Sequence, residues 1–118
     1  MAIRRPVVAK MASRALSKYR AVATVVDGRR FASRKEAERY QALRLLQKAG
    51  EIEKLQIQVK YPIQVNGEPI CQYWADFVYV DCRSGHTVVE DVKGVRTAVY
   101  RLKKKLLHAV YGIDIVES

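Results

Sequence analysis

The sequence predicts an α/β fold, in which the helices and strands of one 118-residue chain share a core. Helical periodicity occurs over residues 33–50 and 97–112, and apolar and polar residues alternate over residues 55–65. Turn residues separate these segments. A chain of this length builds one compact domain rather than two, and we expect that domain to span residues 18–118.

The first part of the chain predicts an arm, a hairpin and a helix. Residues 1–17 show no sustained periodicity, and we expect them to form a flexible basic arm. Asp27-Gly28 is the pair that a tight type I′ hairpin turn prefers. Ser33 is a typical helix N-cap, and Gly50 stands where the helix should end.

Three strands should follow this helix. In the strand over residues 55–65, alternation places four apolar residues on one face: Ile57, Val59, Tyr61 and Ile63. Asn66-Gly67 turns the chain into a second strand over residues 70–82. Ser84-Gly85 then leads to a third strand over residues 88–94, which should pair with the second.

The second helix, residues 97–112, should end at Gly112 and precede a short last strand over residues 113–116. Its periodicity predicts an apolar stripe of Val99, Leu102, Leu106, Ala109 and Val110. The opposite stripe carries Arg101, Lys104, Lys105 and His108, and Tyr100 and Lys103 lie between the two.

The charge of the chain is its most informative bulk property. The net charge is +10, and residues 1–20 and 93–113 contain no acid. Such blocks favour polyanions, because counterion release contributes much of the binding free energy. A solubilising surface and an arm for anionic membranes are the alternatives. We interpret the pattern as nucleic-acid binding, with Arg4 and Arg5 in the arm among the contacts.

Other classes of protein are disfavoured. The sequence has no apolar run that could span a bilayer and no apolar segment of a secretory signal, so we expect a cytoplasmic protein without a membrane partner. Cys71 and Cys82 fall in predicted strands without the spacing of a zinc site, and we interpret both as reduced core thiols.

Charged residues stand where buried strands usually carry apolar ones. Asp91 and Lys93 share one strand face, and pairing of the second and third strands should place Asp76 beside Asp91. Two carboxylates this close need a cation, either a divalent metal or the lysine. The alternative is a partly buried ion-pair cluster. Glu90 lies on the opposite face and is interpreted as a structural or surface acid.

The first helix adds an acid with two interpretations. Glu36 borders the apolar stripe of Tyr40, Leu43 and Leu46, whereas Glu38 lies further from it. Ser33 and Glu36 also have the spacing of a capping box, in which the glutamate only satisfies a backbone N–H.

Taken together, Glu36 in FASRKEAERY, Asp76 in YWADFVY and Asp91-Val92-Lys93 in VVEDVKG resemble the motif of the PD-(D/E)XK nuclease superfamily. Residues 18–117 are similar to a family of small phage- and prophage-encoded proteins assigned to that superfamily. Ala75 stands where the superfamily's name has proline. The resemblance implies a restriction-endonuclease-like core with a mixed central β-sheet flanked by helices.

The resemblance also implies a chemistry, Mg²⁺-dependent hydrolysis of phosphodiester bonds, with Mn²⁺ as a substitute. Asp76 and Asp91 would hold the metal with the main-chain carbonyl of Val92, and Glu36 would join directly or through water. Lys93 would orient or help deprotonate the attacking water.

Several residues should contact the substrate. The second helix starts close to Lys93, so Tyr100, Arg101, Lys103 and Lys104 could grip phosphates beside the cut, and Gln58 could contact DNA from its strand. We expect a structure-specific DNA endonuclease, similar to a Holliday-junction resolvase and acting as a homodimer in recombination. The alternative is a non-catalytic module on the same fold that binds nucleic acid or a protein partner.

Overall fold

The computed structural model describes residues 23–118 and divides the chain into two compact units, Met1–Gly50 and Glu51–Ser118. The expected basic arm, with Arg4 and Arg5, lies outside the described residues.

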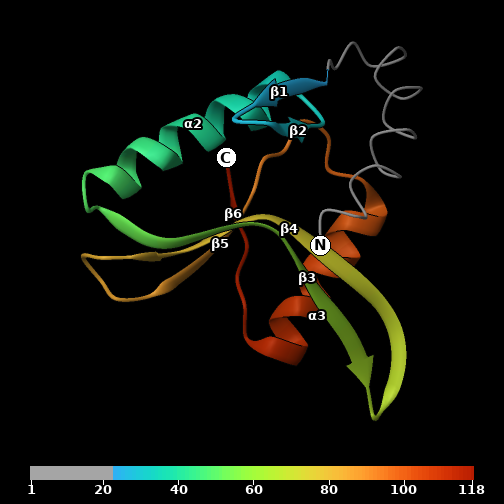
Figure 1. The fold of residues 1–118 in the computed structure, drawn as a ribbon. Helices are drawn as coiled ribbons and strands as arrows, with labels where there is room; N and C mark the ends of the chain where they lie inside the picture. The colour runs from blue at the N-terminus through green and yellow to red at the C-terminus, as the bar shows by residue number, and fades with distance from the viewer. Residues whose placement is uncertain (1–22) are drawn as a thin grey trace. The chain divides into compact units, whose positions relative to one another are not determined.

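A β-hairpin and a helix form the described part of the first unit (Figure 1). Strands β1 (Thr24–Val26) and β2 (Arg29–Phe31) pair antiparallel, with Val26 opposite Arg29. The two linking residues, Asp27 and Gly28, have φ angles of +53° and +74°. Both angles are positive, as a type I′ turn requires, so the predicted hairpin is confirmed.

Helix α2 (Arg34–Lys48) also begins and ends as predicted. The Ser33 hydroxyl accepts a hydrogen bond from the backbone N–H of Glu36 at 3.1 Å, and Gly50 follows the last turn with a φ of +81°. The buried face contains Glu36, Ala37, Tyr40 and Leu43, and the Tyr40 ring lies 5.0 Å from that of Phe31. Leu46, predicted on this face, is instead 36% exposed.

The second unit is built on a mixed four-stranded sheet in the order β3-β4-β5-β6. Strands β3 (Ile52–Val65), β4 (Glu68–Asp81) and β5 (Thr87–Asp91) are antiparallel, and β6 (Val116–Glu117) pairs parallel to β5. The α/β class, the mixed sheet and the pairing of β4 with β5 are therefore confirmed. The last strand begins three residues later than predicted, because residues 113–115 connect it to the preceding helix.

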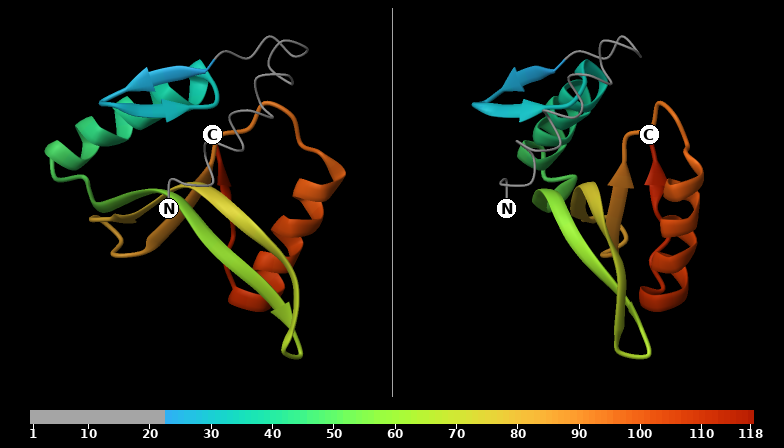
Figure 2. Two further views of the ribbon diagram at one scale, coloured as in Figure 1. Left: turned by 45° about the vertical axis from the view of Figure 1, so that its right-hand side comes forward. Right: turned by 90° about the vertical axis from the view of Figure 1, so that its right-hand side faces the viewer.

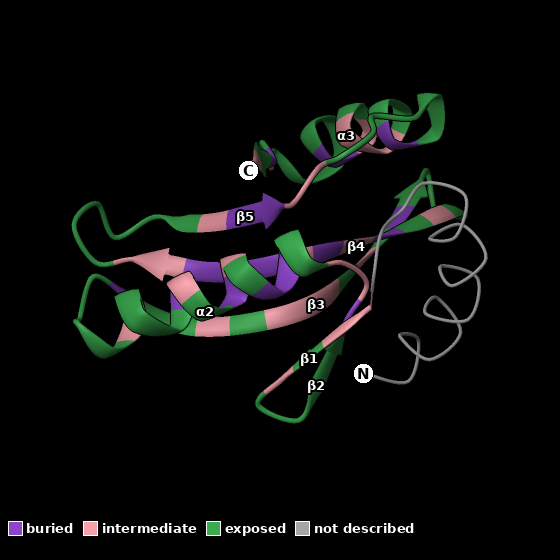
Figure 3. Ribbon diagram, turned by 90° about the horizontal axis from the view of Figure 1, so that it is seen from above, coloured by how far each residue is buried: buried purple, intermediate pink, exposed green. Residues whose placement is uncertain are grey.

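Helix α3 (Ala98–Tyr111) lies along the sheet and comes between β5 and β6 in the chain (Figure 2). Thr97 caps its first turn, and Gly112 ends it in the left-handed conformation, as predicted. Buried residues gather in the middle of β4 and at the end of β5 (Figure 3). The core of this unit consists of Ile63, Tyr73, Ala75, Val78, Val89, Tyr100, Leu107 and Ile115.

The predicted apolar stripe of α3 is wrong except for Leu106, which is half-buried and packs against the core. Val99, Leu102 and Val110 are 62%, 59% and 42% exposed, whereas Tyr100 and Leu107 are buried. Two lysines of this helix are instead half-buried: Lys103 Nζ donates to the carbonyl of Gln72, and Lys104 Nζ lies 3.2 Å from Glu117. Long aliphatic stems can be buried while their charged ends find polar partners.

The β3–β4 hairpin changes its packing where Gln58 faces Asp76. The register continues from Ile57–Phe77 to Val59–Ala75, so Gln58 lies opposite Asp76, and its φ is +54°. Val59 packs against the core, while Phe77 is fully buried outside that cluster. A non-glycine residue in the left-handed region bends a strand, and such sites are common beside functional residues. Ile57 therefore does not share a face with Val59 as predicted.

The two cysteines differ in how far they are buried. Cys82 follows β4 and is exposed, so it is not the core thiol predicted, whereas Cys71 is half-buried within β4. Both cysteines are free. Within residues 23–118, no helix is both long and apolar enough to cross a membrane.

Candidate active site

Asp91, the last residue of β5, is the centre of a buried polar cluster in the second unit. Only 4% of the residue is exposed. Its Oδ2 accepts a hydrogen bond from the Tyr73 hydroxyl at 2.5 Å and lies 3.0 Å from Lys93 Nζ. Burial, together with the Asp91 carboxylate, raises the pKa of Tyr73 above its ordinary value, so the hydroxyl remains a proton donor.

Asp76 lies beside Asp91 across the strand pair. Phe77 pairs with Glu90, and one further step along the antiparallel register brings Asp76 opposite Asp91. Asp76 Oδ2 accepts a hydrogen bond from the backbone N–H of Val92 at 2.8 Å. This bond ties the Asp76 carboxylate to the end of β5. The two residues thus lie at one end of the strand pair, as the sequence predicted.

Lys93 lies beyond the end of β5 rather than inside a strand, yet it still reaches the carboxylates. Its backbone N–H donates to the carbonyl of Ser118, which fixes the main chain. Its Nζ lies 3.8 Å from the centroid of the Tyr100 ring as well as 3.0 Å from Asp91. The ammonium group is therefore held between a carboxylate and an aromatic face, with 18% of the side chain exposed.

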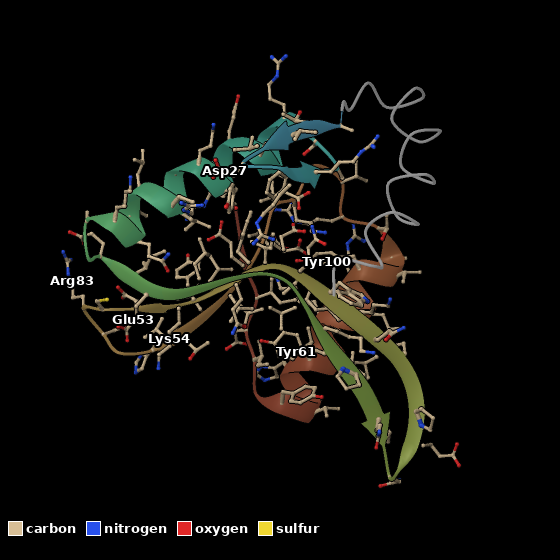
Figure 4. All side chains as sticks on the ribbon, viewed as in Figure 1. Asp27, Glu53, Lys54, Tyr61, Arg83 and Tyr100 are labelled. Atoms are coloured by element: carbon tan, nitrogen blue, oxygen red, sulfur yellow. The ribbon has the colours of Figure 1, made fainter. Side chains whose placement is uncertain are left out.

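Tyr100, in the first turn of α3 and labelled in Figure 4, connects Lys93 to a second cluster around Glu117. The Tyr100 hydroxyl donates to Glu117 Oε2 at 2.7 Å. Arg96 lies 2.8 Å from the other oxygen, and Lys104 is 3.2 Å from Oε2. These donors, the Tyr100 hydroxyl first, lower the pKa of Glu117 to about 2. Burial, followed by the bond to Glu117, raises the pKa of Tyr100.

Glu90 is a structural acid and not a surface one. It is fully buried. Its two carboxylate oxygens accept hydrogen bonds from the hydroxyls of Tyr79 at 2.6 Å and Ser118 at 2.7 Å. These bonds compensate the cost of burying the side chain. Ser118 makes a second hydrogen bond to β5, in which its backbone N–H donates to the carbonyl of Asp91.

Glu36 belongs to the first unit, on the buried face of α2. It is 5% exposed, and Glu38 on the same helix is exposed, so the predicted difference between the two acids is confirmed. The Ser33 hydroxyl caps the backbone of Glu36, which is one half of the capping box. The structure thus brings Asp76, Asp91 and Lys93 together in one unit and places Glu36 in the other.

The residues predicted to contact nucleic acid are found in several settings. Gln58 lies opposite Asp76, and Tyr100 lies against Lys93. Arg101 is exposed on α3. Lys103 and Lys104 are half-buried and bonded to Gln72 and Glu117, as described above.

Sequence reasoning missed Tyr73 and Glu117. Alternation in β4 places Tyr73 on the face opposite to Asp76, and only the change of packing near Gln58 brings its hydroxyl to Asp91. Glu117 could have been found, because a last strand parallel to β5 pairs Asp91 with Glu117. The sequence feature that indicates this site is an acid at the end of a strand that follows a helix, because a helical crossover makes that strand parallel to the one before it.

The cluster offers oxygen ligands of the type that Mg²⁺ prefers. Among residues 23–118, no group of three or more His, Cys, Asp or Glu side chains is arranged to hold a metal ion. Mg²⁺ is often bound by only one or two carboxylates, with water and substrate phosphate as the other ligands. Asp76 and Asp91 supply such a pair, and the main-chain carbonyl of Val92 follows directly. These three groups are therefore the described donors that could hold a Mg²⁺ ion.

Comparison with known proteins identifies a family. No curated protein and no solved structure matches the chain. Residues 16–115 match the family described as "Protein of unknown function (DUF1064)". Because this match covers most of the sequence, including the whole Asp76–Asp91–Lys93 cluster, the chain belongs to the DUF1064 family.

Proposed function

We propose that this protein is a metal-dependent DNA endonuclease that hydrolyses phosphodiester bonds. The observation that carries the proposal is the placement of Asp76 and Asp91 at the end of the β4–β5 pair, where Asp76 accepts a hydrogen bond from Val92 N–H and Lys93 Nζ lies 3.0 Å from Asp91. The net charge of +10 supports a polyanionic substrate. The resemblance to the PD-(D/E)XK superfamily rests on the same three residues and on Glu36.

The chain's own residues would divide the work. Asp76 and Asp91 would hold Mg²⁺, each in a fixed orientation: Val92 N–H bonds to Asp76, and the Tyr73 hydroxyl bonds to Asp91. Mg²⁺, when bound, would polarise the phosphodiester and make water a better nucleophile. Lys93 would offset the negative charge that builds up on the phosphate and orient the attacking water. The Tyr100 ring would hold the Lys93 ammonium in place.

Branched DNA is the substrate class that we propose, cut by a homodimer in the manner of a Holliday-junction resolvase. Six cations and no acid lie within residues 93–113, the segment that follows Asp91 in the chain. Phosphate contacts position a protein on nucleic acid without reading the bases. A small basic protein would therefore select DNA by its shape, and paired cuts at a junction would need a second copy.

A non-catalytic binding module is the second candidate, and one observation favours it. Asp91 Oδ2 already accepts a hydrogen bond from Tyr73 and pairs with Lys93. An ion-pair cluster of this kind can serve structure alone. Such a protein would bind DNA or a partner without cutting.

The experiment that separates the two candidates is a cleavage assay on a panel of labelled DNAs. The full chain would be incubated with junction, flap, nicked and linear duplexes of matched sequence, in Mg²⁺, Mn²⁺ or EDTA. We expect cleavage of a branched DNA that requires a divalent metal. Binding to DNA without cleavage of any substrate in either metal would support the module instead.

A further inference from the structure

A pocket of about 500 Å³ lies on the α3 side of the second unit, between α3 and the segment that leads into β6. Its volume falls within the range of small-ligand pockets. Five of its nine lining residues are basic, namely Arg96, Arg101, Lys104, Lys105 and His108, and their aliphatic stems contribute to a wall that is largely apolar.

The charges in this pocket are only partly balanced. Glu117 pairs with Arg96 and Lys104, and Asp114 pairs with His108 at 2.7 Å. Across the part of the chain that is described, Arg101 and Lys105 form no ion pair, and both are exposed. Four permanently charged cations thus face two carboxylates, which leaves the pocket positive.

One side chain, that of Tyr100, connects the pocket to the cluster of Asp76, Asp91 and Lys93. Tyr100 lines the pocket, and its ring carries Lys93 Nζ at 3.8 Å. Lys93 in turn lies 3.0 Å from Asp91. The contacts from the pocket through Tyr100 and Lys93 to Asp91 are therefore continuous, so an anion in the pocket would lie on the Tyr100 side of the Asp76–Asp91–Lys93 cluster.

We propose that this pocket binds a phosphate group of a nucleic acid strand next to the cleaved bond, with Arg101 and Lys105 as the direct contacts. Arginine and lysine are the side chains that hold phosphate most often, the first through a fork of N–H donors and the second as a point charge. Glu117 keeps Arg96 and Lys104 in place at the edge of the pocket. This inference rests on the proposed function, but it concerns binding and not the chemical step.

The test measures binding of labelled single-stranded oligonucleotides to the full chain in EDTA, over a series of salt concentrations. One oligonucleotide carries a 5′-phosphate and the other, of the same sequence, a 5′-hydroxyl. We expect Arg101→Gln/Lys105→Gln to weaken binding at least tenfold at low salt. The log–log salt slope should fall by about 0.7 for each phosphate that the variant no longer neutralises.

The control variant is Lys60→Gln/Arg83→Gln, which removes the same charge from exposed residues of this unit outside the pocket. Because both double variants lose two positive charges, they are compared at the same salt concentration. We expect the affinity of the control to stay within about twofold of the wild type. If the two double variants weaken binding equally, the basic residues of α3 are a solvated surface and the pocket proposal is wrong.

The two oligonucleotides identify the source of the phosphate. A terminal phosphate in the pocket would make the 5′-phosphorylated strand bind tighter, and Arg101→Gln/Lys105→Gln would abolish that difference. An internal phosphodiester would give equal binding of both strands, each weakened by the variant. EDTA prevents metal-dependent cleavage, so this experiment measures binding alone. A protein that cuts no DNA could still bind phosphate in the pocket, and a protein that cuts DNA could still fail this test.

Discussion

The Asp91 carboxylate is held by a hydroxyl and an ammonium group while it is almost fully buried. Removing one partner from a buried ion pair leaves an uncompensated charge. Lys93 should therefore contribute both to the stability of the fold and to phosphodiester cleavage. Unfolding and cleavage measurements on one variant would report the two contributions separately.

Lys93→Ala should abolish cleavage and lower the free energy of unfolding by about 3 kcal/mol. Mg²⁺ should bind this variant at least as well as the wild type, because the metal would replace the missing cation beside Asp91, and so should restore part of the stability. Thermal unfolding with and without Mg²⁺ measures both effects. Lys60→Ala, at an exposed position of β3, is the control. A variant that Mg²⁺ fails to stabilise would argue against a metal at Asp91.

Glu36 and Glu38 are a matched pair on α2, the first buried and the second exposed. Glu36→Gln should reduce cleavage at least tenfold and leave the stability nearly unchanged, because glutamine can also close a capping box. Glu38→Gln should be neutral in both respects. Cleavage rates and melting temperatures of the two variants check this. Equal activity in Glu36→Gln and the wild type would mean that Glu36 serves only as a helix cap.

Helix α3 and strand β6 are joined by Glu117, which the Tyr100 hydroxyl, Arg96 and Lys104 all contact. These contacts lower the pKa of Glu117 from 4.5 to about 2. A folded-state pKa below the unfolded value contributes stability above pH 4.5, which is lost as the pH falls towards 2. The packing of α3 on the sheet should therefore weaken in acid.

Glu117→Gln should be less stable than the wild type at pH 7, and the difference in melting temperature should shrink as the pH falls from about 4.5 to about 2. Thermal unfolding across this range measures it. The control is Glu68→Gln, at an exposed position at the start of β4. A difference that stays constant with pH would show that the Glu117 carboxylate is not coupled to folding.

The elements could be predicted from the sequence because their ends depend on local physics. Asp27-Gly28 suits positive φ angles, Ser33 supplies an N-cap oxygen, and Gly112 accepts the left-handed conformation. The convergence of Asp76 and Asp91 followed from pairing across a short turn. Each of these predictions needs only residues that are near in sequence or that lie on directly connected strands.

The faces of α3 and β4 could not be predicted, because long-range partners decide them. Val99 and Leu102 look like a core stripe, yet Tyr100 and two lysines face the sheet, where Gln72 and Glu117 provide acceptors. The left-handed residue Gln58 changes the packing of the hairpin, although nothing in a glutamine indicates a positive φ. Tyr73 therefore reached the site without a sequence signal.

The whole chain carries a charge of +10, and the basic residues of positions 1–17, where we expect an arm, form a separate block in the sequence from those of residues 93–113. None of the residues proposed to bind the metal lies within residues 1–17. Removing residues 1–17 should therefore weaken DNA binding and reduce its salt dependence, by about 0.9 in log–log slope for each phosphate of duplex DNA that the arm neutralises. Cleavage at saturating DNA should remain.

Binding of the truncated chain and the full chain to one duplex, measured at several salt concentrations, checks this expectation. A truncated chain with the same affinity and the same salt slope would show that Arg4 and Arg5 do not bind DNA. Loss of cleavage at saturating DNA would instead give the arm a part in the chemistry.

The proposed function requires that Asp91 takes part in metal-dependent hydrolysis, and the Mg²⁺-dependent cleavage rate of Asp91→Asn on the best substrate measures this directly. Asparagine keeps the shape and can still accept the Tyr73 hydrogen bond, and the Lys93 ammonium that loses its ion pair with Asp91 is partly exposed to water, so the fold should persist at a lower stability. The control is Asp81→Asn, at the far end of β4, where the carboxylate accepts hydrogen bonds from the following turn. We predict that Asp91→Asn loses cleavage by at least a thousandfold, about 4 kcal/mol in activation free energy, while Asp81→Asn cleaves like the wild type. Cleavage by folded Asp91→Asn at the wild-type rate would contradict the account.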